Sequence, residues 1–141
     1  MSSGKKLVGA LVVETEATLP IMVVRLPMFD KVADKLFTPE ETADLEYAVA
    51  SCRHLGRELG VVIKGTGGVR KMRWQLDENN KGKRGGARIW YYHGGDHMPV
   101  FLVAAYPKSK KENLSAAEKK LIRARIQELD KEWEKYRDDE E

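Results

Sequence analysis

Three short segments rich in β-branched and aromatic residues decide the fold: Val69-Arg-Lys-Met-Arg-Trp-Gln75, Ala87-Arg-Ile-Trp-Tyr-Tyr-His93 and Val100-Phe-Leu-Val-Ala-Ala-Tyr106. Residues of these types favour strands. The first gap, residues 76–86, is polar and contains Gly-Gly, and the second contains the hairpin turn Gly94-Gly95-Asp96. Because short connections join neighbouring antiparallel strands, the sequence predicts an antiparallel meander.

Helical segments flank these strands. Thr38 with Glu41 forms a capping box, which predicts a helix from Pro39 to about Cys52, with further turns to residue 59. A second capping box, Ser115 with Glu118, predicts a long amphipathic C-terminal helix. The pattern of apolar residues adds a strand at 21–26, a helix at 28–36, and a short strand or buried link at 61–63. The fold class is therefore α+β, a small antiparallel β-sheet with helices packed on one face.

The size and composition of the chain indicate one globular domain. With 141 residues and a hydrophobic content of 42%, the chain is long and apolar enough to bury its own core. We expect an N-terminal extension at 1–19 with room for a short strand, a single domain at 20–137 and an acidic tail at 138–141. No signal peptide and no membrane span are expected, and the single cysteine excludes an internal disulfide, so a cytoplasmic location is predicted.

Positive charge is concentrated in the middle of the chain. The whole chain carries a net charge of +3, whereas the segment from Lys64 to Lys111 has 11 lysine and arginine residues and 3 acidic residues, a net charge of +8. Such an asymmetry indicates an anionic partner, with nucleic acid the first candidate and a merely solubilising surface the alternative.

The alternation of side chains along the strands separates the basic residues from the expected core residues. Met72, Trp74, Ile89 and Tyr91 fall on one side of the predicted sheet, and if helices cover that side, the open side presents a second group of residues. Cations that pair with phosphates and rings that stack on unpaired bases suit single-stranded RNA. If helices cover the opposite side instead, the rings of this second group are core. The group consists of Lys71, Arg73, Arg88, Trp90 and Tyr92.

Three blocks in order carry a family resemblance: Gly65-Thr-Gly-Gly-Val-Arg-Lys-Met-Arg-Trp74, Gly85-Gly-Ala-Arg-Ile-Trp-Tyr-Tyr92 and Phe101-Leu-Val-Ala-Ala-Tyr-Pro-Lys-Ser-Lys-Lys-Glu-Asn-Leu-Ser115. In order and spacing they resemble the HigB-like branch of the RelE superfamily of toxin–antitoxin toxins, over residues 20–135. The resemblance implies a ribosome-dependent endoribonuclease that cleaves mRNA and inhibits translation. It also implies a cognate antitoxin, often of the helix-turn-helix type, and a sheet whose open face takes the RNA.

Candidate site residues follow from the matching motifs. The resemblance implies catalytic roles for Lys71, Arg73, Arg88, Lys108 and Lys111, and we assign RNA binding to Arg70, Lys83, Arg84, Trp90, Tyr92, Tyr106 and Lys110. Some relatives carry a base-stacking aromatic residue a few positions after the last basic block. Here residues 112–115 contain no ring, so Trp90, Tyr92 and Tyr106 are the candidate replacements.

Cleavage of this kind needs alignment, charge neutralisation on the phosphorane, and proton transfer, with no metal or cofactor. Arginine suits the second task because its guanidinium group binds phosphate in a bidentate way. Lys71 or Lys108 is the candidate base and Lys111 the candidate acid or phosphate clamp. The alternatives are acid–base catalysis by His93 and His97, a non-catalytic nucleic-acid-binding protein on the same fold, and a ParE-like inhibitor of a topoisomerase.

Overall fold

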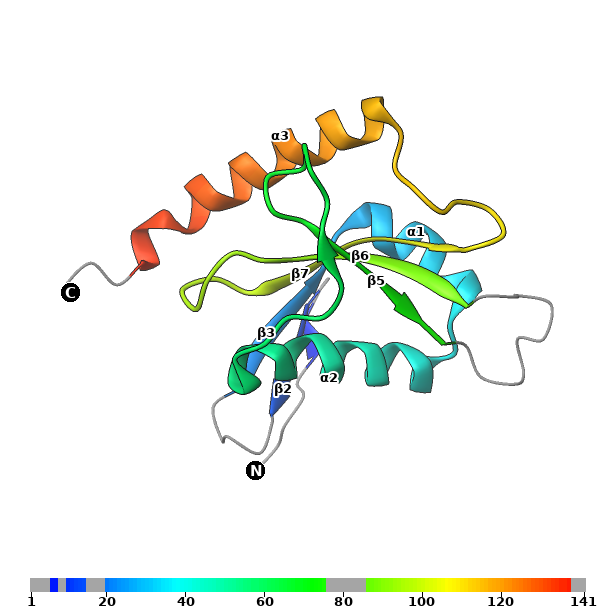
Figure 1. Cartoon of the computed structure of the whole chain (residues 1–141). Helices are drawn as coiled ribbons and strands as arrows, with labels where there is room; N and C mark the ends of the chain where they lie inside the picture. The colour runs from blue at the N-terminus through cyan, green and yellow to red at the C-terminus, as the bar shows by residue number, and fades with distance from the viewer. Residues whose placement is uncertain (1–5, 8–9, 15–19, 76–85, 138–141) are drawn as a thin grey trace.

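The computed structural model describes residues 6–7, 10–14, 20–75 and 86–137. Within these ranges it has an α+β fold in which helices pack against one mixed, mostly antiparallel sheet, as the sequence predicts (Figure 1). The elements in chain order are β1 (Lys6–Leu7), β2 (Ala10–Glu14), β3 (Pro20–Arg25), α1 (Pro27–Leu36), α2 (Pro39–Leu55), β4 (Val61–Val62), β5 (Arg70–Trp74), β6 (Ala87–His93), β7 (Val100–Pro107), α3 (Ala116–Trp133) and the 3-10 turn η2 (Glu134–Tyr136).

The strands lie in the order β1-β2-β3-β7-β6-β5-β4, so five strands of five or more residues are flanked by two very short edge strands. β4 to β7 form the predicted antiparallel meander. β3 pairs with β7 in parallel, through Val23↔Val100 to Arg25↔Leu102, and this is the one parallel pairing among the described strands. The N-terminal segment contributes more than the single predicted strand, because β1 and β2 both add to the edge beyond β3. The predicted acidic tail lies outside the described residues.

Both predicted capping boxes are present and set the starts of the two longer helices. At α2 the Thr38 hydroxyl accepts from the Glu41 amide at 3.1 Å, and Glu41 accepts from the Thr38 amide at 3.0 Å. At α3 Ser115 and Glu118 make the same reciprocal pair at 3.1 and 2.8 Å. Each box satisfies two amide groups that a helix start would otherwise leave without a partner.

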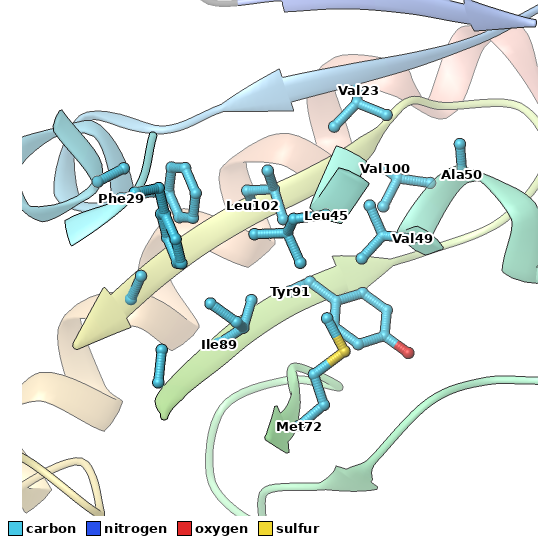
Figure 2. Packing of buried hydrophobic residues seen from close by; sticks show 14 of the residues in the cluster. Val23, Phe29, Leu45, Val49, Ala50, Met72, Ile89, Tyr91, Val100 and Leu102 are labelled. Atoms are coloured by element: carbon cyan, nitrogen blue, oxygen red, sulfur yellow. The ribbon is translucent and has the colours of Figure 1, made fainter. Parts of the chain in front are cut away.

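One face of the sheet packs against α1 and α2. Figure 2 shows this cluster, in which Phe29 of α1 and Leu45 and Val49 of α2 meet the inward side chains of the strands. The strand residues are those that alternation placed on the covered side, including Met72, Ile89 and Tyr91. Of the two arrangements that alternation left open, the one with helices on the Met72, Ile89 and Tyr91 side is therefore present.

The other face is not left open along its whole length, and here the expectation of helices on one face is wrong in part. α3 runs on the opposite side of the sheet from α2 (Figure 1). Its apolar residues Ile122, Ile126 and Leu129 join a second buried cluster with Trp90, Tyr92, Phe101 and Val103. The Tyr92 hydroxyl donates to Asp130 Oδ1 of α3 at 2.6 Å, which fixes the helix over that end of the sheet.

α3 therefore covers one end of this second face and leaves a basic region at the other end.

No helix in the described ranges is long and apolar enough to cross a lipid bilayer.

Candidate nucleic-acid interface

A row of polar side chains crosses three strands on the face that carries α3. In the strand register Arg73 of β5 lies opposite Arg88 of β6, and Arg88 lies opposite Tyr106 of β7. Directly opposed residues project from the same face, and neighbouring strands are about 4.8 Å apart. Two guanidinium groups and a phenol ring thus form a line at right angles to the strands, which we call the cationic row. Lys71, opposite Trp90, lies on the same face two residues along β5 from Arg73.

A carboxylate from the segment between β7 and α3 lies over this row. Glu112 Oε2 is 3.1 Å from Arg88 Nε and 3.7 Å from Lys71 Nζ. The Lys71 ammonium group also donates to the Glu112 carbonyl oxygen at 3.0 Å and to Asn113 Oδ1 at 2.9 Å. The pKa of Glu112 is lowered, chiefly by the hydrogen bond from Arg88 and further by the charges of Arg88, Lys71 and Lys108. The face therefore already binds one anionic group, supplied by the chain itself.

Glu112 is a residue that the sequence analysis did not single out. It belongs to residues 112–115, for which the sequence shows only the absence of a ring. One feature of the sequence could have identified Glu112. It is a single acidic residue directly after Lys108-Ser-Lys-Lys111, in a chain segment that must pass the basic strands. Arg88 is only 3% exposed, whereas the Glu112 side chain is 39% exposed, so the carboxylate is the partner that can move away into solvent.

Two predicted catalytic cations stay accessible. Arg73 and Lys108 are exposed, and neither forms an ion pair with another residue in the described part of the chain. The Lys108 amide donates to the Gly86 carbonyl at 3.0 Å, which anchors the start of the segment beside β6. The field of Lys108 reaches Glu112. These two cations can meet an incoming anion without breaking an existing pair.

Lys111 is held between an acid and a ring. Its ammonium group donates to both carboxylate oxygens of Glu118, at 3.0 and 2.8 Å, and lies 5.2 Å from the centroid of the Tyr106 ring. Its hydrogen bond to Glu118 raises the pKa of Lys111 above its usual value. Lys111 therefore keeps its proton at neutral pH and is better suited to clamp an anion, or to donate a proton late in a reaction, than to accept one.

Of the three candidate stacking rings, only Tyr106 is accessible. It is partly exposed and meets Trp90 edge to face, with ring centroids 6.1 Å apart and planes at 72°. Trp90 and Tyr92 are buried beneath α3, so the prediction that they bind RNA is wrong for this structure. Burial and the bond to Asp130 both raise the pKa of Tyr92, so its hydroxyl stays neutral. These two rings are core, as in the alternative that alternation left open, but Tyr91, which that alternative would expose, is buried as well.

Arg70 is also in a different place from the predicted one. It is opposite Tyr91, on the α2 side of the sheet, and donates to the carbonyl oxygens of Leu59 and Gly60 at 3.3 and 3.1 Å. These bonds tie Arg70 to the loop before β4, on the other face of the sheet from the cationic row. Lys83 and Arg84 lie outside the described residues. Lys110 is exposed near the end of the last strand.

A groove of about 520 Å³ lies at the outer end of the cationic row. β4 pairs only with Arg70 and Lys71, so the rest of β5 forms a sheet edge there. Gly60 allows the close approach of the two strands, since a side chain at this position would collide with the Lys71 carbonyl. The groove thus brings Arg73 of the row and the neighbouring Lys71 together with the partly exposed indole of Trp74. Its lining comprises Leu59, Gly60, Val61, Lys71, Met72, Arg73, Trp74 and Glu112.

The histidine alternative lies away from this face. His93 is at the opposite end of β6 from Arg88, and its Nδ1 is 2.7 Å from Glu58 Oε2. Glu58 also accepts from the Tyr91 hydroxyl at 3.2 Å, on the α2 side of the sheet. Neither His93 nor His97 joins the cationic row. Within the described ranges no group of histidine, cysteine and acidic residues is placed to hold a metal ion. No protein-family model matches the chain.

Proposed function

We propose that this protein binds single-stranded RNA across the cationic row and cleaves it without a metal. The observation that carries the proposal is the Glu112 carboxylate, which Arg88 and Lys71 hold 3.1 and 3.7 Å away. An RNA phosphodiester carries the same single negative charge and also presents two free oxygen atoms to these donors, and Arg73 lies beside Arg88 as a further donor. The accessible Tyr106 ring at the end of the row adds a surface on which an unpaired base can stack.

In the reaction that we propose, the ribose 2′-oxygen attacks the adjacent phosphorus. The bond from phosphorus to the 5′-oxygen of the next nucleotide breaks, and the products are a cyclic phosphate and a free 5′-hydroxyl. Arg88 and Arg73 would neutralise the extra negative charge on the phosphorane. Arg88 is the better placed of the two, because it is buried in the middle of the row and its side chain is already held in position.

The two proton transfers of the reaction assign different roles to the lysines near the row. A base must take the 2′-proton, which a lysine can do only as the neutral amine. Lys108 is an exposed lysine close enough to affect Glu112, and it has no ion pair in the described part of the chain that would hold its proton. Lys71 is already engaged as a donor to Glu112 and Asn113. Lys111 would give a proton to the departing 5′-oxygen, because its pairing with Glu118 keeps it in the protonated form. We therefore assign Lys108 as the base and Lys111 as the acid.

The family resemblance extends this proposal to a biological role. It implies the toxin of a toxin–antitoxin pair, acting on mRNA in the ribosome and inhibited by a helix-turn-helix antitoxin. The ribosome would then supply part of the alignment, so the isolated protein is expected to cleave RNA slowly.

Expression in growing cells with mapping of mRNA 5′ ends tests the proposal. New ends within translated frames, absent with Arg88→Ala at equal protein levels, would support it. Growth arrest with intact mRNA would refute it, and a change in DNA supercoiling in the same cells would point instead to a ParE-like topoisomerase inhibitor.

A non-catalytic RNA-binding protein is the second candidate. It is favoured by one observation, the engagement of both Lys71 and Lys111 by carboxylates, which leaves fewer lysines able to move protons. Single-turnover cleavage of a labelled RNA on purified ribosomes separates the two functions. Binding with no cleavage at saturating protein would favour the second candidate.

A further inference from the structure

A second groove, of about 370 Å³, lies between α1 and the end of β7. It is distinct from the groove at the edge of β5. Four lysines border an apolar floor, and the ring of Tyr106 forms one wall. The lining comprises Lys31, Val32, Lys35, Leu36, Tyr106, Pro107, Lys110 and Lys111. No predicted site residue comes from α1, whereas Tyr106, Lys110 and Lys111 on the other side of the groove are predicted site residues.

The lysines of α1 are directed to this groove without a counter-ion. Lys31 and Lys35 are exposed and one helical turn apart, a spacing at which like charges repel. Within the described ranges neither they nor Lys110 form an ion pair, although Asp30 of the same helix lies 3.7 Å from Arg25. Three unpaired ammonium groups around one groove favour an anionic ligand.

The groove is continuous with the cationic row. Tyr106 is the last member of the row and also lines the groove, and Lys111 lies over the same ring. A strand that crosses from Arg73 past Arg88 to Tyr106 therefore arrives at the α1 lysines. The apolar floor of Val32, Leu36 and Pro107 suits a ribose or a base better than it suits a carboxylate side chain.

We infer that the groove between α1 and β7 is a second RNA subsite, in which Lys31, Lys35 and Lys110 bind backbone phosphates that flank the reacting phosphate. This inference rests on the proposed RNA substrate but not on cleavage. It predicts that affinity depends on RNA length, because a dinucleotide can occupy the row alone and a longer strand occupies both sites.

The test compares the double variant Lys31→Ala/Lys35→Ala with the wild-type chain. The probes are a labelled dinucleotide and a labelled octanucleotide, both with 2′-O-methyl groups so that neither can be cleaved. A matched control, Lys120→Ala/Lys131→Ala, removes the same charge from exposed positions on α3. Circular dichroism checks that each variant is folded.

The expected result is selective loss of octanucleotide affinity. Each phosphate contact to a single strand contributes about 0.7 to the slope of log K against log salt, so two lost contacts lower the slope by about 1.4 and weaken binding about 25-fold at 0.1 M salt. Dinucleotide affinity should stay within about twofold, because that probe makes no more contacts than the row provides. The control variant should bind both probes like the wild-type chain.

Three results would overturn the inference: unchanged octanucleotide affinity in the α1 variant, equal loss for both probes, and equal loss in the α3 control. A wild-type chain that binds polyglutamate in place of the octanucleotide would also overturn it and would assign the groove to an acidic protein. If the length-dependent loss occurs but no ribosome-bound RNA is cut, the groove stands and the proposed cleavage fails.

Discussion

Replacing Arg88 with methionine removes the central charge of the cationic row while keeping most of the side-chain volume. Arg88 is 3% exposed, and its Nε is 3.1 Å from Glu112 Oε2. Methionine fills a similar space with apolar atoms, and the Glu112 side chain, 39% exposed, can turn into water. Because the carboxylate that loses its partner can be hydrated and is not left buried, we expect the free energy of unfolding to change by no more than about 1 kcal/mol.

RNA binding should respond much more strongly than stability. A hydrogen bond to a charged group contributes about 1.5–3 kcal/mol, which corresponds to about 10–150-fold in Kd. Because the phosphate must first displace Glu112 from Arg88, the lower end of this range, about tenfold, is the expected loss. Cleavage on ribosomes should fall further, about 10²–10³-fold, since the arginine opposes charge that is largest in the transition state.

The assay is fluorescence anisotropy with an uncleavable octanucleotide, together with urea unfolding and single-turnover cleavage. Arg125→Met on α3 is the matched control, because Arg125 is exposed and also pairs with a glutamate, Glu128, at 3.0 Å. If Arg88→Met binds and cleaves RNA as well as Arg125→Met does, the cationic row is not the RNA site. If Arg88→Met is unfolded, the same comparison is made with Arg73→Met, whose side chain is exposed and has no role in the core.

Three further predictions concern the surroundings of the row. Glu112→Gln should tighten RNA binding several-fold, because it removes the competing charge, whereas Glu128→Gln should have no effect; weaker binding by Glu112→Gln would contradict the displacement. Tyr92→Phe should lower the free energy of unfolding by about 1–3 kcal/mol in urea titrations, since the partly buried carboxylate of Asp130 on α3 loses its donor; an unchanged midpoint would show that this bond does not hold α3. Because Lys111 lowers the pKa of Glu118 below its ordinary 4.5, the stability from this pair is present above pH 4.5 and is lost as the pH falls below it. Urea unfolding at pH 7 and pH 3 should therefore separate wild-type from Glu118→Gln at the higher pH only.

Local structure could be predicted well because local chemistry determines it. β6 begins and ends at the predicted residues, and both capping boxes start their helices where the hydroxyl and the glutamate are three residues apart. The parallel pairing of β3 with β7 depends on segments more than 70 residues apart, and no local pattern specifies it. The ion pair between Glu112 and Arg88 could not be predicted for the same reason, because the two residues are 24 residues apart and meet only in the folded chain.

The error about the second face has a specific cause. Alternation assumes that one side of a strand is covered, but Ala87 to Tyr92 are all buried, because β6 is a central strand with α2 on one side and α3 on the other. The run of four large apolar or aromatic residues at 89–92 carried this signal, since a half-exposed strand would alternate with polar residues. The apolar stripe of the amphipathic helix α3 also had to pack against an apolar surface, and the aromatic rings of the strands were the apolar surface available to it.

The position of α3 connects the second core to the proposed chemistry. The capping box at Ser115 fixes where the helix begins, and Tyr92 holds the helix farther along, so the segment from Lys108 to Glu112 must cross the end of the sheet to reach it. Glu118 serves twice, because it caps the helix and binds Lys111. The interaction of α3 with the rings that were expected to bind RNA is thus what places Lys108, Lys111 and Glu112 beside the cationic row. We therefore expect a change that loosens α3 to alter RNA binding, and the Tyr92→Phe variant used for the stability measurement provides that test. Unchanged RNA affinity in a Tyr92→Phe variant with clearly lowered stability would show that the segment holds its position independently of the helix.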